Sequence, residues 1–248
     1  MIPGPGPFLT GEWRYLAIMN FAIDPAILLP LVPSGTELDP WNDQMLVSVV
    51  GFLFRDTRVR GIPFPGHRTF EEVNTRFYVR RRALSEWRKG VTFVREIVPR
   101  RAVAHVARSL YNEPYQALPM NHRIESPPET AATRLSVVYT WKYKGTEQRL
   151  TMSTASDALP VQDGSIEHFI TERHWGYTMQ RDGSTLEYRV NHARWLTRRA
   201  HEQELECDIA GNFGKDFVAC LSGRPSSAFL AEGSPIEVFR GVLIERRT

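Results

Sequence analysis

The sequence predicts a mainly β protein, an antiparallel barrel or sandwich with a few short helices. Stretches rich in apolar, aromatic and β-branched residues follow one another at residues 45–54, 72–79, 90–98, 134–143 and 148–154. Asp182-Gly183, a dipeptide typical of tight hairpin turns, joins two further stretches at 175–180 and 185–190. Helical patterns are few and short. A succession of strands with hairpin signals and few helices is typical of antiparallel β proteins.

Short helices are expected between these strands. Asp24 followed by Pro25 is a start signal, because aspartate caps the first turn of a helix and proline fits its first position. A second short helix is expected after Ser165, and a third near residues 215–221. None of them is long enough to change the fold class.

The longest expected helix opens at Pro99 and runs to about Tyr111, where Asn112 and Pro114 end it. Four apolar residues recur in it at helical spacing and form its expected buried side: Val103, Val106, Ala107 and Leu110. The helix is therefore expected to pack one face against the sheet.

One domain covering residues 1–248 accounts for the chain, because β-barrels of about 200–250 residues commonly form a single unit. The proline-rich stretch at 125–130 predicts a loop that could divide two halves, but neither half looks complete by itself. Residues 1–12, which begin with alternating prolines and glycines, are expected to form a loosely ordered arm. Neither a signal peptide nor an apolar run of membrane-spanning length is evident, so a cytoplasmic protein without a membrane partner is expected.

Composition narrows the classes of partner. The formal net charge is only +3, and the short arginine runs have no stacking aromatic residues between them, so no nucleic-acid partner is expected. The seven histidines show no zinc-binding spacing, and dinucleotide and phosphate-loop motifs are absent from the sequence, so we expect no metal and no cofactor. Two cysteines are too few for a disulfide framework and indicate a reducing compartment. A small-molecule ligand and a homo-oligomer remain compatible with the sequence.

Only four lysines occur, at positions 89, 142, 144 and 215. Schiff-base catalysis needs a lysine whose pKa is lowered, commonly by burial. None of the four lies in an apolar run that would bury it. Imine chemistry is therefore not expected.

Four polar residues alternate along the strand at 72–79 and share one face: Glu72, Asn74, Arg76 and Tyr78. An acid, an amide, a guanidinium and a phenol that point into a barrel can form a polar network or a ligand pocket. The same pattern also fits the solvent-facing side of an amphipathic strand. The strand pattern alone leaves both interpretations open.

A second candidate group lies at the end of the expected helix. Arg108 is offset by one position from the apolar side, so its guanidinium can hold a ligand carboxylate or cap the last carbonyls of the helix. Tyr115 follows the turn at Pro114, where its hydroxyl can bind a ligand or simply pack. Tyr111 lies between these two residues.

Many short segments between Trp13 and about Trp195 together resemble the YqjF-like family of unknown function, part of the acetoacetate decarboxylase-like superfamily. The segments that carry the resemblance are Trp13, Asn20-Phe21, Asp24-Pro25, residues 31–39, 70–79 and 90–93, Ala107-Arg108, Tyr111, Pro114-Tyr115, Met120, Phe169, Glu172-Arg173, His192 and Trp195. Each segment alone is weakly specific, and their joint order is what identifies the family. The resemblance implies an antiparallel β-barrel with a central cavity.

The resemblance also implies which residues line that cavity. In the decarboxylase pattern an arginine is followed six residues later by proline and then by the Schiff-base lysine. Here Arg108 and Pro114 match the arginine and the proline, while Tyr115 stands where the lysine would be. A phenol forms no imine, so the resemblance argues against decarboxylation by that route. The superfamily's pocket glutamate corresponds to Glu72.

Three hypotheses about function follow. The first is a small-molecule-binding protein for an anionic or carbonyl compound, with a pocket formed by Glu72, Asn74, Arg76, Arg108, Tyr111 and Tyr115. The second is an acid–base enzyme of the lyase, isomerase or hydrolase type, with Glu72 and Tyr115 as catalytic candidates. The third is a structural or interaction protein, in which side chains such as Trp141, Phe93 and Tyr78 would fill the barrel.

Overall fold

The computed structural model describes residues 6–63, 66, 68–84, 86–125 and 134–244. The loop expected at 125–130 lies outside the described residues from position 126 onward. The chain enters the sheet at Leu9, the first residue of strand β1 (Leu9–Ala22), which pairs with strands on both sides. The loosely ordered arm expected over residues 1–12 is therefore a strand at residues 9–12, because ladder hydrogen bonds to two neighbours fix its backbone. Residues 1–5 lie outside the described residues.

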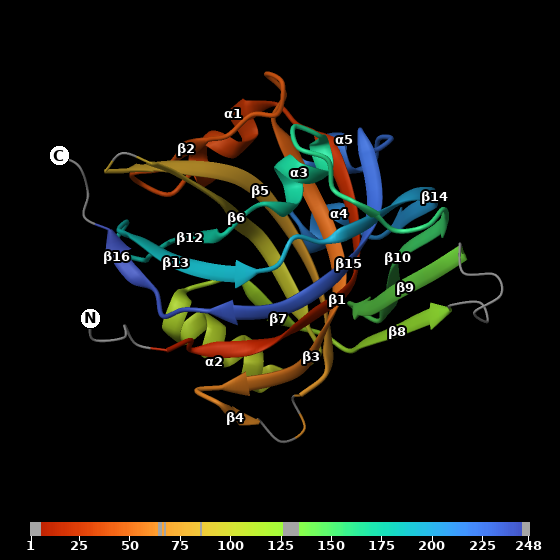
Figure 1. Cartoon of the computed structure of the whole chain (residues 1–248), viewed down its shortest axis with the longest axis horizontal. Helices are drawn as coiled ribbons and strands as arrows, with labels where there is room; N and C mark the ends of the chain where they lie inside the picture. Colours follow the sequence, from red (N-terminus) through yellow and green to blue (C-terminus); the bar gives the residue numbers. More distant parts are fainter. Residues whose placement is uncertain (1–5, 64–65, 67, 85, 126–133, 245–248) are drawn as a thin grey trace.

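Seven strands of the described chain close into a barrel (Figure 1). In spatial order they are β13 (Thr185–His192), β12 (Trp175–Met179), β6 (Glu86–Val98), β5 (Phe70–Ala83), β3 (Leu46–Val59), β1 and β15 (Ser227–Val238). A pairing between β15 and β13 completes the ring. The barrel is mixed and not purely antiparallel, since β12 runs parallel to β6 at Gly90. The expected β-barrel is otherwise confirmed.

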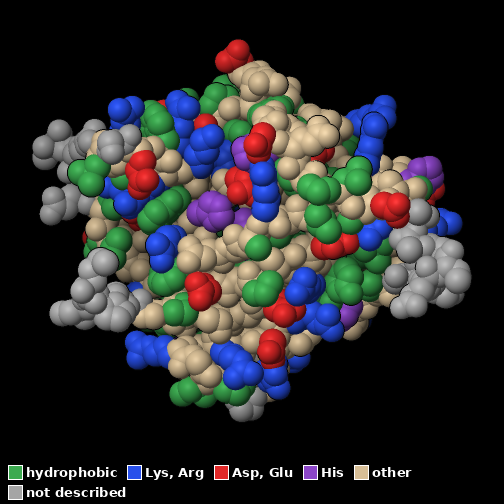
Figure 2. All heavy atoms as spheres, in the orientation of Figure 1, with side chains coloured by type: hydrophobic (Ala, Val, Ile, Leu, Met, Phe, Trp, Pro, Cys, Tyr) green, Lys and Arg blue, Asp and Glu red, His purple; other side chains and the backbone are tan. Residues whose placement is uncertain are grey.

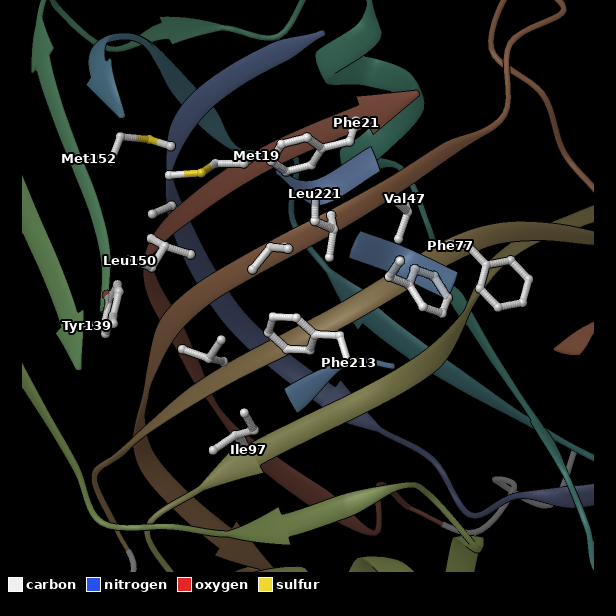
Figure 3. Packing of buried hydrophobic residues seen from close by; sticks show 14 of the residues in the cluster. Met19, Phe21, Val47, Phe77, Ile97, Tyr139, Leu150, Met152, Phe213 and Leu221 are labelled. Atoms are coloured by element: carbon white, nitrogen blue, oxygen red, sulfur yellow. The ribbon is translucent and has the colours of Figure 1, made fainter. Parts of the chain in front are cut away.

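A second sheet continues from β15 and folds over one side of the barrel. Its strands are β14 (Leu196–Glu206), β10 (Thr146–Ala155), β9 (Arg134–Tyr143) and β8 (Met120–Glu125). The largest apolar core lies between this sheet and the outer face of the barrel. Figure 3 labels part of it: Met19, Phe21, Val47, Phe77 and Ile97 of the barrel, Tyr139, Leu150 and Met152 of the outer sheet, and Phe213 and Leu221. Because this layer buries the outer face of β5, both faces of that strand are buried.

Short elements complete the chain. The short strands are β2 (Glu37–Leu38), β4 (Ile62–Pro63), β7 (Tyr115–Ala117), β11 (Leu159–Pro160) and β16 (Val242–Ile244). The helices are α1 (Pro25–Leu28), η1 (Leu29–Leu31), α2 (Arg101–Tyr111), α3 (Ile166–Thr171), α4 (Ile209–Asn212), η3 (Lys215–Phe217) and α5 (Val218–Leu221). Figure 1 places α1 and α3 at one end of the barrel and α2 toward the other.

The predicted start signals do cap helices. The Asp24 side chain accepts a hydrogen bond from the Ala26 amide at 2.8 Å, and Ser165 accepts one from the His168 amide at 3.1 Å. At the end of α2, Asn112 adopts the left-handed conformation with φ of 55°, which terminates the helix. These local signals placed α1, α3 and the end of α2, whereas α2 begins at Arg101, two residues after the expected start at Pro99.

The face that α2 presents to the sheet differs from the expectation. Ala104 is the fully buried residue of this helix, whereas Val106 and Leu110 are 42% and 57% exposed. Helix α2 packs against β7 and the end of β6, so its contact area is narrow. Val103, Val106 and Ala107 instead line a cavity, which explains why an apolar face is retained without dense packing.

The described part of the chain contains no helix that is long and apolar enough to cross a membrane. On the face shown in Figure 2, acidic and basic side chains are interspersed over the surface. Charge on this face is therefore mixed and not concentrated in one patch of a single sign.

Candidate functional site

A cavity of about 210 Å³ lies inside the barrel. Strands β1, β3, β5, β6, β12 and β13 contribute to its wall, together with α2 and the segment around α3. Most of its surface is apolar, and much of that is aromatic: Trp13, Phe52, Phe54, Phe70, Phe93 and Trp195. A dry apolar cavity of about 150 Å³ accommodates benzene, so this one has room for a small organic molecule but not for a large cofactor.

Strand β5 presents three of the expected residues to this cavity: Glu72, Asn74 and Arg76. They alternate along the strand, so they share the lumenal face, and all three are at most 8% exposed. The structure therefore supports the lumenal interpretation of the alternating polar pattern over the solvent-facing one. Tyr78, the next residue on the same face, is buried and does not line the cavity.

Strand register brings the distant residues to the same level. Asn74 of β5 lies opposite Glu96 of β6, and Glu96 lies opposite Tyr115 of β7. Across this row the Tyr115 hydroxyl donates a 3.0 Å hydrogen bond to Glu72 Oε2, and Asn74 Nδ2 donates a 2.9 Å bond to Glu72 Oε1. Both carboxyl oxygens of Glu72 therefore have a donor in place.

Two further buried carboxyls complete the polar group, Glu96 and Glu113. Glu113 Oε1 accepts hydrogen bonds from Thr178 Oγ1 at 2.5 Å and from the Tyr188 hydroxyl at 2.8 Å. Glu96 and Glu113 also interact with each other through a side-chain hydrogen bond, which requires a proton on one of the two carboxyls. Three carboxyls, Glu72, Glu96 and Glu113, thus share one desolvated region; we call them the carboxyl cluster.

Burial disfavours the ionised form of the three carboxyls, because it removes the carboxylates from water. It raises the pKa of Glu72 to about 7, although hydrogen bonds from Asn74 and Tyr115 and the charge of Arg76 act to lower it. Burial likewise raises the pKa of Glu113 to about 7, against hydrogen bonds from Thr178 and Tyr188. Burial and the neighbouring charges of Glu113 and Glu72 raise the pKa of Glu96 well above its ordinary value. Near neutral pH the cluster therefore retains protons and can both donate and accept them.

Two tyrosines next to the cluster act as neutral hydrogen-bond donors. Burial, followed by the charges of the cluster, raises the pKa of Tyr115 well above its ordinary value. The same causes raise the pKa of Tyr188. Their hydroxyls therefore keep their protons and donate to carboxylate or ligand oxygens.

The structure gathers most of the predicted site residues but not Arg108. Glu72, Asn74, Arg76 and Tyr111 line the cavity, as does Tyr115. Arg108 lies in the last turn of α2 at an exposed position and does not line the cavity. Its neighbour Ala107 faces the cavity, and a step of one residue turns the next side chain by about 100° around the helix axis. Arg108 is therefore not brought to the carboxyl cluster.

Three charged residues of the cavity wall were not predicted: Glu96, Glu113 and Arg173. Glu96 is a single acid next to Arg95 near the end of a strand, which is a weak signal by itself. Glu113 lies between Asn112, which ends the helix, and Pro114. The sequence predicts a turn at this position and not a buried site. Arg173 follows α3, and its partner Asp39 is far away in the sequence.

No three histidine, cysteine, aspartate or glutamate side chains in the described ranges are arranged to hold a metal ion. No lysine lines the cavity, so all four lysines of the chain are outside it. The groups present at this site can form hydrogen bonds, transfer protons and interact with a ligand through the guanidiniums of Arg76 and Arg173.

Sequence comparison relates this chain to proteins of unknown function. Residues 10–235 match the model of the DUF2071 family, described as an uncharacterized conserved protein. The uncharacterized protein YqjF of Bacillus subtilis strain 168 is 26% identical over 195 residues, which are 77% of this chain and 75% of YqjF. The family match spans the carboxyl cluster and most of the barrel.

Structural comparison relates the fold to enzymes with little sequence identity. Acetoacetate decarboxylase of Legionella pneumophila superposes with a TM-score of 0.64 at 12% identity, over 97% of this chain and 88% of that one. An acetoacetate decarboxylase-like enzyme of Sphingomonas wittichii RW1 gives 0.66 at 12% identity, over 98% and 95%. The enduracididine biosynthesis enzyme MppR, solved with pyruvate, gives 0.66 at 12% identity, over 100% and 93%. The chain therefore belongs to the DUF2071 family, and its fold is that of the acetoacetate decarboxylase-like proteins.

Proposed function

We propose that the cavity binds a small molecule with a carbonyl or anionic group and an apolar body. The observation that carries this proposal is the convergence of the buried carboxyls Glu72, Glu96 and Glu113 and the Tyr115 hydroxyl in the wall of a mostly apolar cavity. Apolar walls with a few convergent polar groups are typical of ligand sites. A purely structural role would be favoured by a filled barrel. Although Trp141 and Tyr78 pack in the two apolar cores, about 210 Å³ remains beside them, with Phe93 in its wall.

The proposed binding is non-covalent. Tyr115 occupies the position that the resemblance assigns to a Schiff-base lysine, and none of the four lysines lines the cavity. The MppR structures with pyruvate show that a related fold accommodates a small oxo acid, which supports testing such molecules here. A phenol at this position can donate a hydrogen bond to a carbonyl oxygen but cannot form an imine.

Titration calorimetry and thermal-shift measurements with pyruvate and with neutral carbonyl compounds such as butanedione test this proposal. We expect saturable binding of at least one of them, weakened at least tenfold by Glu72→Gln and unchanged by Glu204→Gln, a matched change at an exposed position of β14. Borohydride treatment in the presence of pyruvate should leave the mass of the protein unchanged. A reduced pyruvate adduct would contradict non-covalent binding, and a lack of saturable binding throughout the panel would contradict the proposed function.

The carboxyl cluster favours acid–base catalysis as a second candidate function. Glu72 has a pKa of about 7, next to the neutral donor Tyr115, which is the arrangement that removal of a proton beside a carbonyl requires. Glu72 would accept the proton while Tyr115 stabilises the enolate oxygen. Exchange of the pyruvate methyl protons for deuterium in heavy water, followed by NMR, tests this step. A rate equal to the buffer rate, or one that Glu72→Gln leaves unchanged, would rule it out.

A further inference from the structure

Arg173 is a rigidly held guanidinium on the cavity wall. Its Nε donates a 2.7 Å hydrogen bond to the Phe169 carbonyl, and one terminal nitrogen pairs with Asp39. The guanidinium also lies over two rings, 3.9 Å from the centroid of Phe169 and 5.0 Å from that of Tyr78. Its other terminal nitrogen, Nη2, is buried and has no partner among the described residues. The protein thus holds the Arg173 guanidinium at Nε, at one terminal nitrogen and against two aromatic rings, and Nη2 remains available as a donor.

Arg76 provides a second buried guanidinium on the same wall. It is 8% exposed, lines the cavity and forms no ion pair with any described residue. Its Nε has no hydrogen-bond partner in that part of the chain. Its charge lowers the pKa of Glu72 and that of Arg173, so the Arg76 guanidinium lies within electrostatic range of both groups. A buried cation without a dedicated counter-charge is costly, so this arrangement favours an anion from outside the chain.

The aromatic residues of the cavity wall indicate the rest of the ligand. Trp13, Phe52 and Phe54 form an aromatic cluster with ring centroids 5.3–6.1 Å apart, and Trp195 lies 6.2 Å from Trp13. Such rings contact a flat apolar group over a large area. The volume of about 210 Å³ exceeds that needed for one benzene-sized ring and leaves room for a carboxylate.

We propose that the cavity binds an aromatic or similarly flat monocarboxylate, whose carboxylate lies between Arg76 and Arg173 and whose ring contacts the cluster around Trp13. This inference rests on the proposed function and names the ligand class for the same cavity. Arg173 takes the anchoring role that sequence analysis gave to Arg108. Two guanidiniums that approach from different elements, β5 and the segment after α3, can bind both oxygens of a carboxylate.

Proton uptake should accompany this binding. The charged and titratable groups around Glu72 are Arg76 of β5, Glu96 of β6, Glu113 after α2, Tyr115 of β7 and Tyr188 of β13. A ligand carboxylate beside Arg76 adds negative charge and offsets the only positive charge in this group. Both effects favour the protonated form of Glu72. Benzoate should therefore bind together with a fraction of a proton near neutral pH.

Calorimetry at pH 7 with benzoate, benzamide and acetate as probes tests the proposal. Benzoate and benzamide differ mainly in charge, whereas benzoate and acetate differ in the apolar body. We expect benzoate to bind at least tenfold more tightly than either of the other two. Comparison of phosphate and Tris buffers, which differ in ionisation enthalpy, should show proton uptake with benzoate and none with benzamide.

Variants then identify the anchoring residues. Arg76→Gln should remove the preference for benzoate over benzamide, and so should the double variant Arg173→Gln with Asp39→Asn, which leaves no buried unpaired charge. Arg134→Gln, the same change at an exposed position of β9, should leave both affinities unchanged. If Arg76→Gln itself fails to fold, the affinity ratio of the wild-type protein still decides the question.

The outcomes separate this inference from the proposed function. If benzamide binds as tightly as benzoate, or if Arg76→Gln retains the preference for benzoate, the anion site is wrong while the small-molecule pocket stands. If benzoate, benzamide and the carbonyl panel all fail to bind, both proposals are wrong. Tight benzoate binding that depends on Arg76 and on the Arg173–Asp39 pair supports both.

Discussion

The Tyr115 hydroxyl donates a 3.0 Å hydrogen bond to Glu72 Oε2, and the two residues belong to strands that both pair with β6. Glu96 of β6 lies opposite Tyr115 on one side and, on the other, opposite Asn74, two residues along β5 from Glu72. The phenol thus stands beside the carboxyl cluster as a donor that cannot lose its proton near neutral pH. A phenol at this position supplies a hydrogen-bond donor and no nitrogen that could form an imine.

Removing this donor should make Glu72 harder to ionise. The hydrogen bond from Tyr115 lowers the pKa of Glu72, so Tyr115→Phe should raise that pKa above its value of about 7. Titration of the Glu72 carboxyl carbon by ¹³C NMR measures the shift directly. Tyr143→Phe, the same change on the outer sheet strand β9, serves as the control and should leave the titration of Glu72 unchanged. An identical Glu72 titration in Tyr115→Phe would show that the hydrogen bond does not form in solution.

The carboxyl cluster should make the protein less stable as the pH rises. Glu72 and Glu113 have folded pKa values of about 7 against an ordinary value of 4.5, so the folded state holds protons that the unfolded state releases in this range. Their contribution is fully present below pH 4.5 and is lost as the pH rises toward 7, at up to about 1.4 kcal/mol per pH unit and group. Urea unfolding at a series of pH values measures it.

The variant Glu113→Gln measures how much the Glu113 carboxyl alone contributes to the pH dependence of the unfolding free energy. The variant should flatten the fall in unfolding free energy between pH 4.5 and 7, because the amide does not titrate. Glu204→Gln, at an exposed position, should keep the wild-type slope. Equal slopes in all three proteins would mean that Glu113 ionises at an ordinary pH and that the cluster holds no extra proton there.

Local patterns in the sequence were sufficient to predict some of the residues that line the cavity. Alternation along β5 predicted that Glu72, Asn74 and Arg76 share a face, because side chains of a strand point to opposite sides in turn. The pattern could not decide which face looks inward, since the outer sheet buries the opposite face as well. The turn at Pro114 made Tyr115 a candidate but left simple packing open, and the family resemblance then indicated that Tyr115 lines the cavity.

The remaining residues depend on contacts between distant segments. Glu113 receives its donors from Thr178 and Tyr188, more than sixty positions further along the chain. Arg173 is paired with Asp39, 134 positions away. Arg108 was misplaced because a single step around α2 separates the cavity wall from solvent. Hydrophobic periodicity shows which side of a helix is apolar. It does not show which of two neighbouring residues faces a cavity when part of that apolar side is exposed to solvent.

The buried pair of Arg173 and Asp39 should be sensitive to loss of either partner alone. Asp39→Ala leaves the Arg173 guanidinium buried without its carboxylate, which should cost about 3–5 kcal/mol of unfolding free energy. The double variant Asp39→Ala with Arg173→Met removes both charges and should recover part of this loss. Glu147→Ala breaks the exposed pair with Arg149 and should change stability by less than about 1 kcal/mol. Urea denaturation of the four proteins checks these values. A double variant no more stable than Asp39→Ala would mean that the packing of Arg173, and not its charge, dominates.

Gly176 of β12 should tolerate no side chain, because Tyr188 occupies the space where a Cβ would lie. In Gly176→Ala the added methyl group overlaps the Tyr188 ring, so either the ring or the strand must move. Overpacking of this kind costs about 1–3 kcal/mol. Displacement of the ring should also break the 2.8 Å hydrogen bond from Tyr188 to Glu113. Because that bond lowers the pKa of Glu113, the pKa should rise in the variant.

Thermal unfolding and a ¹³C NMR titration of Glu113 measure the two effects of this substitution together. Gly6→Ala, where nothing lies within 4 Å of the added atom, is the matched control and should change neither. In Gly176→Ala with Tyr188→Ala the overlap is gone, so the second substitution should cost less stability in this background than in the wild-type protein. If Gly176→Ala is as stable as wild type and titrates alike, β12 lies further from Tyr188 than the structure shows. The cavity beside Glu113 would then be wider.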